Sequence, residues 1–317
     1  MQYEHHRAVS SLYYSEGNQV SVLVCGPADG HTFDYINWSL QELGIESEII
    51  DTRKKYNEIY EQCVRLDPEF LIVPRQGIVY EQIKRVKEET DIKVYMWNTD
   101  SRGTLQRYES EFGTDLIRLF KICDTVYTVA IGEVEMFAKE GINAKWLVQG
   151  IWPGVDNKPS IKREYKHDIS FLGSIDRLHE TDGGRISMLR GLYTAGYDIN
   201  NEFASGAEAS AVYYLSRINI GHAHSPSLGE NSVRDFKIMG SGGFLLTQWY
   251  RGIEEIMNIG VEMDCYKTPE ECVSKCKHYF ENDNIRESIA QNGYESAHDR
   301  HKYSDRLKTI IEDYKNG

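Results

Sequence analysis

The sequence predicts an α/β protein built from two doubly wound parallel sheets, and three observations carry this prediction. From residue 20 to residue 148, short apolar segments alternate with segments whose apolar residues recur at helical spacing. A segment containing Gly and Pro, residues 149–156, then interrupts the alternation. The same alternation begins again at residue 168. Strands that alternate with helices form parallel sheets, because each helix carries the chain back to the edge where the previous strand began.

The first half of the chain is expected to form a Rossmann-like domain. Its predicted strands are residues 20–25, 46–51, 70–73, 93–97, 125–129 and 145–148. The predicted helices between them are residues 33–43, 56–66, 81–90, 115–123 and 133–139. The strands are short and mostly apolar, as strands buried on both faces of a parallel sheet are.

The second half follows the same plan without repeating the sequence. Its predicted strands are residues 168–172, 197–203, 217–220 and 244–246, and its first helices are residues 185–195, 207–214 and 231–240. Further helices are expected to begin near Thr268, to cover residues 285–292 with Gly293 as the stop, and to cover residues 303–314. We expect an N-terminal domain at residues 1–152, a second domain at 153–300, and a helix within 301–317 that packs back towards the first domain.

The stretch from Glu230 to Thr247 is predicted to hold the functional site. A polar head at residues 230–232 precedes a helical pattern, a Gly242-Gly243 stop and an apolar strand. In an open α/β sheet, ligands bind at the carboxyl ends of the strands, where helix N-termini present free N–H groups. The sequence therefore predicts an anion site at the start of this helix.

Composition and charge limit the classes of function. The chain is 40% hydrophobic and 27% charged, and no apolar run approaches the roughly 20 residues of a membrane span. The polar N-terminus does not resemble a signal peptide, so we expect a cytoplasmic protein. The net charge is −13, which disfavours general nucleic-acid binding. The six cysteines form no CxxC pair, so we expect no metal site.

Three segments of the second half resemble the CgeB-like, or spore-maturation-protein, glycosyltransferases. They are D-I-S-F-L-G-S at residues 168–174, V-R-D-F-K-I-M-G-S-G-G-F-L-L at 233–246, and N-G-Y-E followed by H-K-Y-S-D-R-L at 292–307. The resemblance covers about residues 165–312, and the first half is similar in architecture. It implies a GT-B fold, in which two Rossmann-like domains face a central cleft. It also implies transfer of a sugar from a nucleotide-diphosphate donor on the second domain to an acceptor on the first.

The resemblance further implies a set of donor-binding residues. They are Gly173, Ser174, Arg177, Arg217, His222, Glu230, Asn231, Ser232, Arg234 and Lys237. The helix that begins near Ser232, with the charge of Arg234, would hold the diphosphate, and Arg185 is a further candidate for phosphate contact. Arg217 is equally consistent with a structural ion pair, and His222 with a solvated loop residue.

Lys237 departs from the pattern of this family, which usually has Glu at this position to hold the ribose hydroxyls. A lysine cannot accept those hydrogen bonds, although its charge suits a phosphate. The alternatives are therefore a changed donor, with Glu230 binding the ribose, or a nucleotide-sugar-binding protein whose catalysis is altered.

On the acceptor side, Asp100 follows the fourth strand and is the first candidate for a catalytic base. Asp29 and His31, after the first strand, are rivals, and each of the three is also consistent with a turn or cap residue. No metal or cofactor is expected.

Two further alternatives keep the fold. One is a nucleotide-sugar 2-epimerase. The other is sugar transfer to a modified nucleic-acid base, for which Arg53, Lys54, Lys55, Arg102 and Arg107 would supply a local basic patch.

Overall fold

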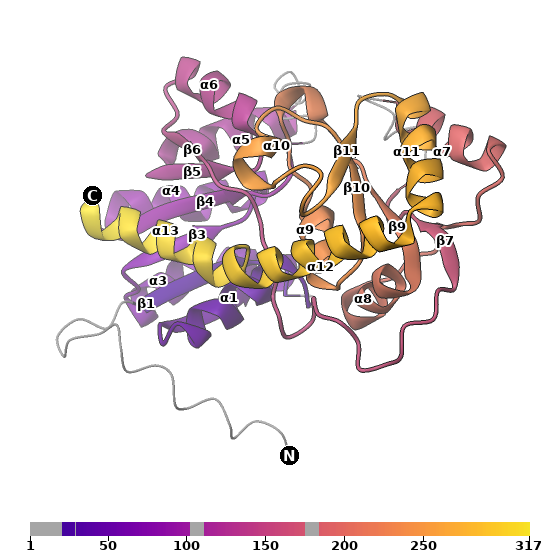
Figure 1. Ribbon diagram of the computed structural model, residues 1–317. Helices are drawn as coiled ribbons and strands as arrows, with labels where there is room; N and C mark the ends of the chain where they lie inside the picture. Colours follow the sequence, from indigo (N-terminus) through magenta and orange to yellow (C-terminus); the bar gives the residue numbers. More distant parts are fainter. Residues whose placement is uncertain (1–20, 29, 102–110, 175–183) are drawn as a thin grey trace.

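The first half of the protein forms a six-stranded parallel sheet. The computed structural model describes residues 21–28, 30–101, 111–174 and 184–317 (Figure 1). The strand order is β2-β1-β3-β4-β5-β6. The strands are β1 (Ser21–Gly26), β2 (Glu46–Asp51), β3 (Phe70–Val73), β4 (Lys93–Asn98), β5 (Thr125–Thr128) and β6 (Ala144–Trp146). The predicted β2 and β3 have the observed bounds, and the other four strands agree within a few residues at each end.

Helices cover both faces of this sheet. They are α1 (Thr32–Glu42), α2 (Thr52–Lys55), α3 (Ile59–Leu66), α4 (Tyr80–Glu89), α5 (Glu111–Ile122) and α6 (Ile131–Lys139). Apolar residues of α3, α4 and α5 pack on one face, and α1 packs on the other. Burial of these residues supplies the main driving force for folding of this half.

The second half forms a five-stranded parallel sheet in the order β11-β10-β9-β7-β8. Its strands are β7 (His167–Ser170), β8 (Ile199–Asn200), β9 (Ser216–Gly221), β10 (Leu245–Gln248) and β11 (Asp264–Tyr266). Its helices are α7 (Arg185–Thr194), α8 (Gly206–Leu215), α9 (Val233–Gly240), α10 (Ile253–Ile256), α11 (Pro269–Glu281) and α12 (Asp283–Arg300), followed by α13 (Tyr303–Asn316). Helices α7 and α11 pack on one face, and α8 and α9 on the other. The prediction of two Rossmann-like α/β halves is thus confirmed.

Helix α12 differs from the prediction that Gly293 ends a helix. It continues through Gly293 to Arg300. A Cβ atom at residue 293 would lie 2.4 Å from the carbonyl oxygen of Glu262, which is closer than van der Waals contact allows. The glycine therefore permits close packing of α12 against the loop before β11, instead of terminating the helix.

The chain passes between the two sheets at two adjacent segments. Ile151 donates its N–H to the His301 carbonyl at 2.8 Å and accepts from the Tyr303 N–H at 2.9 Å. A Cβ at Gly150 would lie 2.6 Å from the same His301 carbonyl. Helix α13 then lies along α1 of the first half, as the yellow helix in Figure 1 shows. Its buried residues belong to the core beneath α1.

The close approach at Gly293 makes a testable prediction about stability. Gly293→Ala should lower the free energy of unfolding by about 2 kcal/mol, since the added methyl group overpacks a backbone contact. Urea denaturation followed by circular dichroism measures this change.

Gly191→Ala in α7 is the matched control, because its Cβ would meet only the Val273 side chain at 3.3 Å. This control should be neutral or gain up to about 1 kcal/mol from helix propensity. Equal effects of the two substitutions would contradict the packing role of Gly293.

Candidate active site

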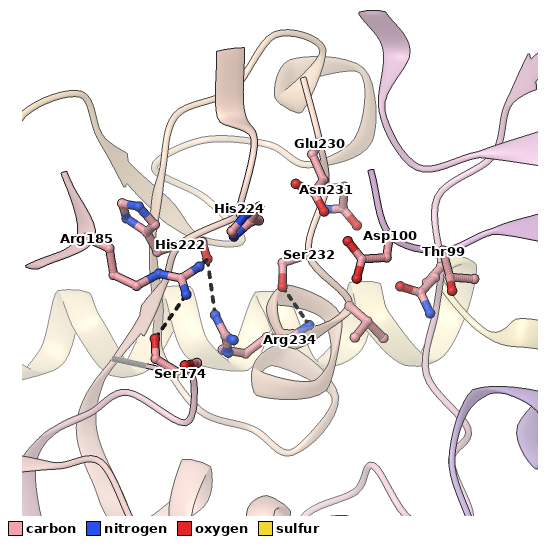
Figure 2. Close-up of a pocket in the computed structure, with 12 residues that line it drawn as sticks. Thr99, Asp100, Ser174, Arg185, His222, His224, Glu230, Asn231, Ser232 and Arg234 are labelled. Atoms are coloured by element: carbon pink, nitrogen blue, oxygen red, sulfur yellow. Dashed lines mark hydrogen bonds between the residues drawn. The ribbon is translucent and has the colours of Figure 1, made fainter. Parts of the chain in front are cut away.

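A cleft of about 200 Å³ lies where the carboxyl ends of the two sheets face each other. Figure 2 shows side chains from both halves converging on it. The lining residues are Thr99, Asp100, Gln149, Ser174, Arg185, His222, His224, Glu230, Asn231, Ser232, Val233 and Arg234. We call this space the interdomain cleft. It includes eight of the residues named from the sequence as site candidates.

Helix α9 begins at the cleft. Ser232 is its N-cap, with extended backbone, and its hydroxyl oxygen accepts from the N–H of Arg234 at 3.4 Å (Figure 2). Ser232 and Val233 both line the cleft. The first turn of a helix carries N–H groups without intrahelical partners and a partial positive charge. This end of α9 therefore favours an anion in the cleft.

Two guanidinium groups stand beside this helix end. Arg234 donates to the carbonyls of Leu172 at 2.8 Å and His222 at 3.2 Å. Arg185 donates to the carbonyls of Ser174 at 3.0 Å and His222 at 3.2 Å. Carbonyl groups orient a guanidinium but do not neutralise its charge. The two guanidinium groups thus lie at the carboxyl ends of β7 and β9, where their N–H groups suit a phosphate group.

Gly173 makes room for one of these arginines. A Cβ at residue 173 would lie 2.7 Å from a terminal nitrogen of Arg234 and 2.9 Å from the Phe171 ring. The neighbouring Ser174 holds Arg185 through its carbonyl group. Gly173 and Ser174, the two residues of the predicted turn, are thus each in contact with one of the cleft arginines.

His222 is held at the cleft wall by Tyr266. The Tyr266 hydroxyl oxygen lies 3.1 Å from Nδ1 of His222 and 3.1 Å from the Gly221 carbonyl oxygen. The residue is almost fully buried at the cleft wall and is not a solvated loop histidine.

The loop at residues 226–231, which we call the docked loop, attaches the second half to the end of β5. Asn231 donates its N–H to the Val129 carbonyl at 3.1 Å, and Ile131 donates to the Gly229 carbonyl at 3.4 Å. Glu230 forms an antiparallel bridge with Ala130. Backbone pairing between the two halves thus fixes the position of residues 229–231 at the cleft.

Two carboxyl groups approach each other across the interdomain cleft. Glu230 comes from the docked loop and Asp100 from the segment after β4 (Figure 2). Burial, with the nearby Asp100 carboxylate, raises the pKa of Glu230 to about 7. The N–H of Ser225 donates to Glu230 Oε2 at 2.6 Å and partly opposes this rise. Glu230 can therefore hold a proton near neutral pH beside the Asp100 carboxylate.

Asn231 is anchored from behind the cleft. Its Nδ2 donates to the Tyr250 hydroxyl at 2.6 Å. Its Oδ1 is buried, and no group in the described part of the chain forms a hydrogen bond with it. Of the residues predicted for the donor side, Ser174, His222, Glu230, Asn231, Ser232 and Arg234 thus meet in one place.

Arg217 lies at the other end of its strand. It is the second residue of β9, so it stands at the amino end of the sheet, away from the cleft. Its guanidinium is 3.8 Å from the Asp283 carboxylate and lies over the rings of Tyr165 and Phe280. The structural ion pair, which was the alternative interpretation of Arg217, is the arrangement observed.

Lys237 and His31 are also outside the group that lines the cleft. The Lys237 ammonium lies 5.2 Å from the centre of the Tyr35 ring of α1, and it partly offsets the burial that raises the pKa of Asp156. Lys237 thus joins the two halves. His31 precedes α1 as its N-cap and makes no capping hydrogen bond with its side chain. The candidates Asp29 and Arg177 lie outside the described residues.

Gln149 is a cleft residue that the sequence did not indicate. It lies in the segment between the two sheets, 154 residues before its hydrogen-bond partner Tyr303. The one sequence signal for a role in the cleft is its position at the start of the Gly- and Pro-containing segment between the two halves.

In the described ranges, no group of three or more His, Cys, Asp or Glu side chains is arranged to hold a metal ion. Among the helices of the described residues, none combines the length and apolar character needed to cross a membrane.

Solved structures of known proteins share this architecture. The HepE protein of Anabaena in complex with UDP-glucose superposes with a TM-score of 0.67 at 8% identity, covering 94% of this chain and 100% of that one. Sucrose-phosphate synthase from Thermosynechococcus elongatus gives 0.65 at 10% identity, covering 94% and 98%. A Listeria monocytogenes protein assigned as a UDP-N-acetylglucosamine 2-epimerase gives 0.53 at 11%, covering 94% and 97%. The fold is therefore of the GT-B type, two Rossmann-like domains facing a central cleft.

A sequence family points in the same direction for the second half. Residues 160–312 match a family described as glycosyl transferase-like. This segment is just under half of the chain, and it contains the second sheet, both cleft arginines and α9. No curated protein sequence matches significantly.

The carboxyl pair predicts a pH-dependent stability. An acid whose pKa is raised on folding stabilises the folded state at low pH, and this contribution is lost as pH rises from the unfolded pKa to the folded one. The free energy of unfolding of the wild type should therefore fall as pH rises from about 4.5 to about 7, because Glu230 ionises over this range. Glu230→Gln should be more stable than the wild type by about 3 kcal/mol at pH 8, and by less than about 1 kcal/mol at pH 5. Urea titrations at both pH values measure the difference.

Asp100→Asn tests the cause. It removes the neighbouring negative charge, so folding should raise the pKa of Glu230 less far above its ordinary value. The loss of stability that accompanies ionisation of Glu230 should therefore be smaller in this variant. A Glu230→Gln effect of the same size at pH 5 and pH 8 would show that Glu230 is not protonated in the folded protein near neutral pH.

Proposed function

We propose that this protein is a glycosyltransferase that moves a sugar from a nucleotide-diphosphate donor to an acceptor in the interdomain cleft. One observation carries the proposal: a helix N-terminus flanked by two guanidinium groups on the second domain faces Asp100 on the first. Glycosyl transfer needs stabilisation of a leaving diphosphate and activation of an acceptor hydroxyl. The match of residues 160–312 to a glycosyl transferase-like family supports this chemistry.

The diphosphate would lie at the N-terminus of α9. There the free N–H groups of the first turn, the Ser232 hydroxyl and the Arg234 guanidinium can donate to phosphate oxygens. Arg185 adds a second positive charge. Because these groups are already held by carbonyl groups, they need little rearrangement as negative charge develops on the leaving group. Solved HepE contains UDP-glucose in the same fold, which supports a nucleotide sugar as donor.

Asp100 would be the base that accepts the proton of the acceptor hydroxyl. It lines the cleft from the first domain, opposite the arginines (Figure 2). Burial and the neighbouring Asp100 raise the pKa of Glu230 to about 7, so Glu230 can carry the proton of the pair while Asp100 acts as the base. The proposed reaction uses no metal and takes place in the cytoplasm. Because the second half resembles the CgeB-like glycosyltransferases, we propose that the protein belongs to that family.

A nucleotide-sugar 2-epimerase is the second candidate. The pairing of Asp100 with Glu230 favours it, because epimerisation needs groups that remove and return protons, and the fold of a 2-epimerase is similar. Formation of an epimer in the absence of an acceptor would identify this activity.

Arg234 should be required for nucleotide binding. Arg234→Lys keeps the charge but loses the fork of donors, and we expect it to weaken UDP binding about tenfold by isothermal titration calorimetry. The same experiment with GDP and TDP identifies the base that this site accepts.

Arg217→Lys is the matched control, since this arginine lies at the amino end of β9. It should change the dissociation constant less than twofold. If Arg234→Lys binds the nucleotides as tightly as the wild type, the diphosphate does not lie at this helix end.

Asp100 should be required for chemistry but not for donor binding. Asp100→Asn should lower kcat for sugar transfer at least about 100-fold, because the amide cannot take up a proton. Its affinity for the donor should stay within about threefold of that of the wild type. Nucleoside diphosphate release, measured with a panel of acceptor sugars, gives kcat. An unchanged kcat would remove Asp100 from the proposed reaction.

A further inference from the structure

Gln149 presents one hydrogen-bond acceptor to the interdomain cleft. Its side chain is 3% exposed. Its Nε2 donates to the Tyr303 hydroxyl at 3.1 Å and to the Thr32 hydroxyl at 3.4 Å, which uses both amide hydrogens. Its Oε1 forms no hydrogen bond among the described residues, and Gln149 lines the cleft. Oε1 is therefore the atom of the Gln149 amide that is left to bind a ligand in the cleft.

The orientation of this amide is fixed by the C-terminal helix. Tyr303 is fully buried, and its ring packs edge-on against Trp97 and Tyr35 of the first half. Its main chain pairs with Ile151, two residues from Gln149. The backbone carbonyl of Gln149 also accepts from Arg306 Nε at 3.2 Å. Main chain and side chain of Gln149 are thus held by α13, so its Oε1 has little freedom to turn away.

The chemistry of Oε1 selects its ligand. A carbonyl oxygen accepts hydrogen bonds and cannot bind a phosphate oxygen, which has no hydrogen to donate. The phosphate groups would be held by Arg234 and the start of α9. Within a nucleotide sugar, the groups that can donate to a carbonyl oxygen are the hydroxyls of the sugars and the N–H of the base. Gln149 comes from the segment that joins the two domains, and it lines the cleft together with Asp100, the proposed base, and the start of α9.

We propose that Gln149 is a specificity-determining residue whose Oε1 accepts a hydrogen bond from a hydroxyl of the transferred sugar, and that Tyr303 is its positioning residue. This inference rests on the proposed function, and it assigns to Tyr303 a part in recognition. An unmade hydrogen bond to a buried group is costly, so the site discriminates against donors that lack this hydroxyl.

The test compares each nucleotide sugar with its free nucleoside diphosphate. UDP and UDP-glucose, GDP and GDP-mannose, and TDP and TDP-glucose are titrated into the wild type, Gln149→Met and Tyr303→Phe by calorimetry. Gln149→Met should weaken binding of the sugar nucleotide about tenfold, and leave that of the free diphosphate within twofold. Tyr303→Phe keeps the ring and removes one anchor of the amide, so it should weaken binding of the sugar nucleotide alone, by about threefold.

Gln41→Met, the same change at an exposed position of α1, is the matched control and should alter neither affinity. Equal weakening for the sugar nucleotide and the free diphosphate would assign Oε1 to the base or ribose and overturn the proposal. So would wild-type affinity of Gln149→Met for the sugar nucleotide. In both cases the proposed function would stand. Absence of binding of all six compounds to the wild type would instead refute the proposed function together with this inference.

Discussion

The backbone pairing of Ile151 with His301 and Tyr303 is the constraint on which the arrangement of the two halves depends. Each sheet presents the carboxyl ends of its strands in one direction, and a shared cleft exists only if those two edges face each other. The two segments that pass between the sheets run side by side, with Gly150 allowing their contact. The docked loop adds a second attachment at β5. Two separate attachments restrict rotation of one half against the other.

The two halves contribute groups of opposite charge to the cleft. The second half contributes two guanidinium groups and a helix N-terminus, and the first half contributes Asp100. Glu230 is the exception, because it belongs to the second half but stands beside Asp100. Its place follows from the docked loop, whose backbone is held by residues 129–131 of the first half. The protonation of Glu230 is therefore a property of the assembled halves, since separating them would remove the Asp100 charge from its surroundings.

Local patterns in the sequence predicted much of this structure. Strands β2 and β3 are encoded in neighbouring residues, and both have the predicted bounds. The helix predicted at residues 231–240 is α9, which begins two residues later, after the Ser232 cap. Helix α10 and strand β11 have four and three residues, too few to show a period, and were missed. Gly293 was misread because glycine commonly ends helices, and the close contact with Glu262 is visible only in three dimensions. Gln149 depends on Tyr303, far away in the chain, and no local signal reports such a pair.

Helix α13 gives the first half a discontinuous core. Leu307, Ile310 and Ile311 fill the face of the first sheet beneath α1, together with residues as early in the chain as Val22. A ribosome that has completed all six strands of that sheet has still not made these side chains. One apolar face of the first half therefore stays uncovered while more than 150 further residues are translated. During that interval the nascent chain exposes a surface of the kind that chaperones bind, and the half that is encoded first is the half that is completed last.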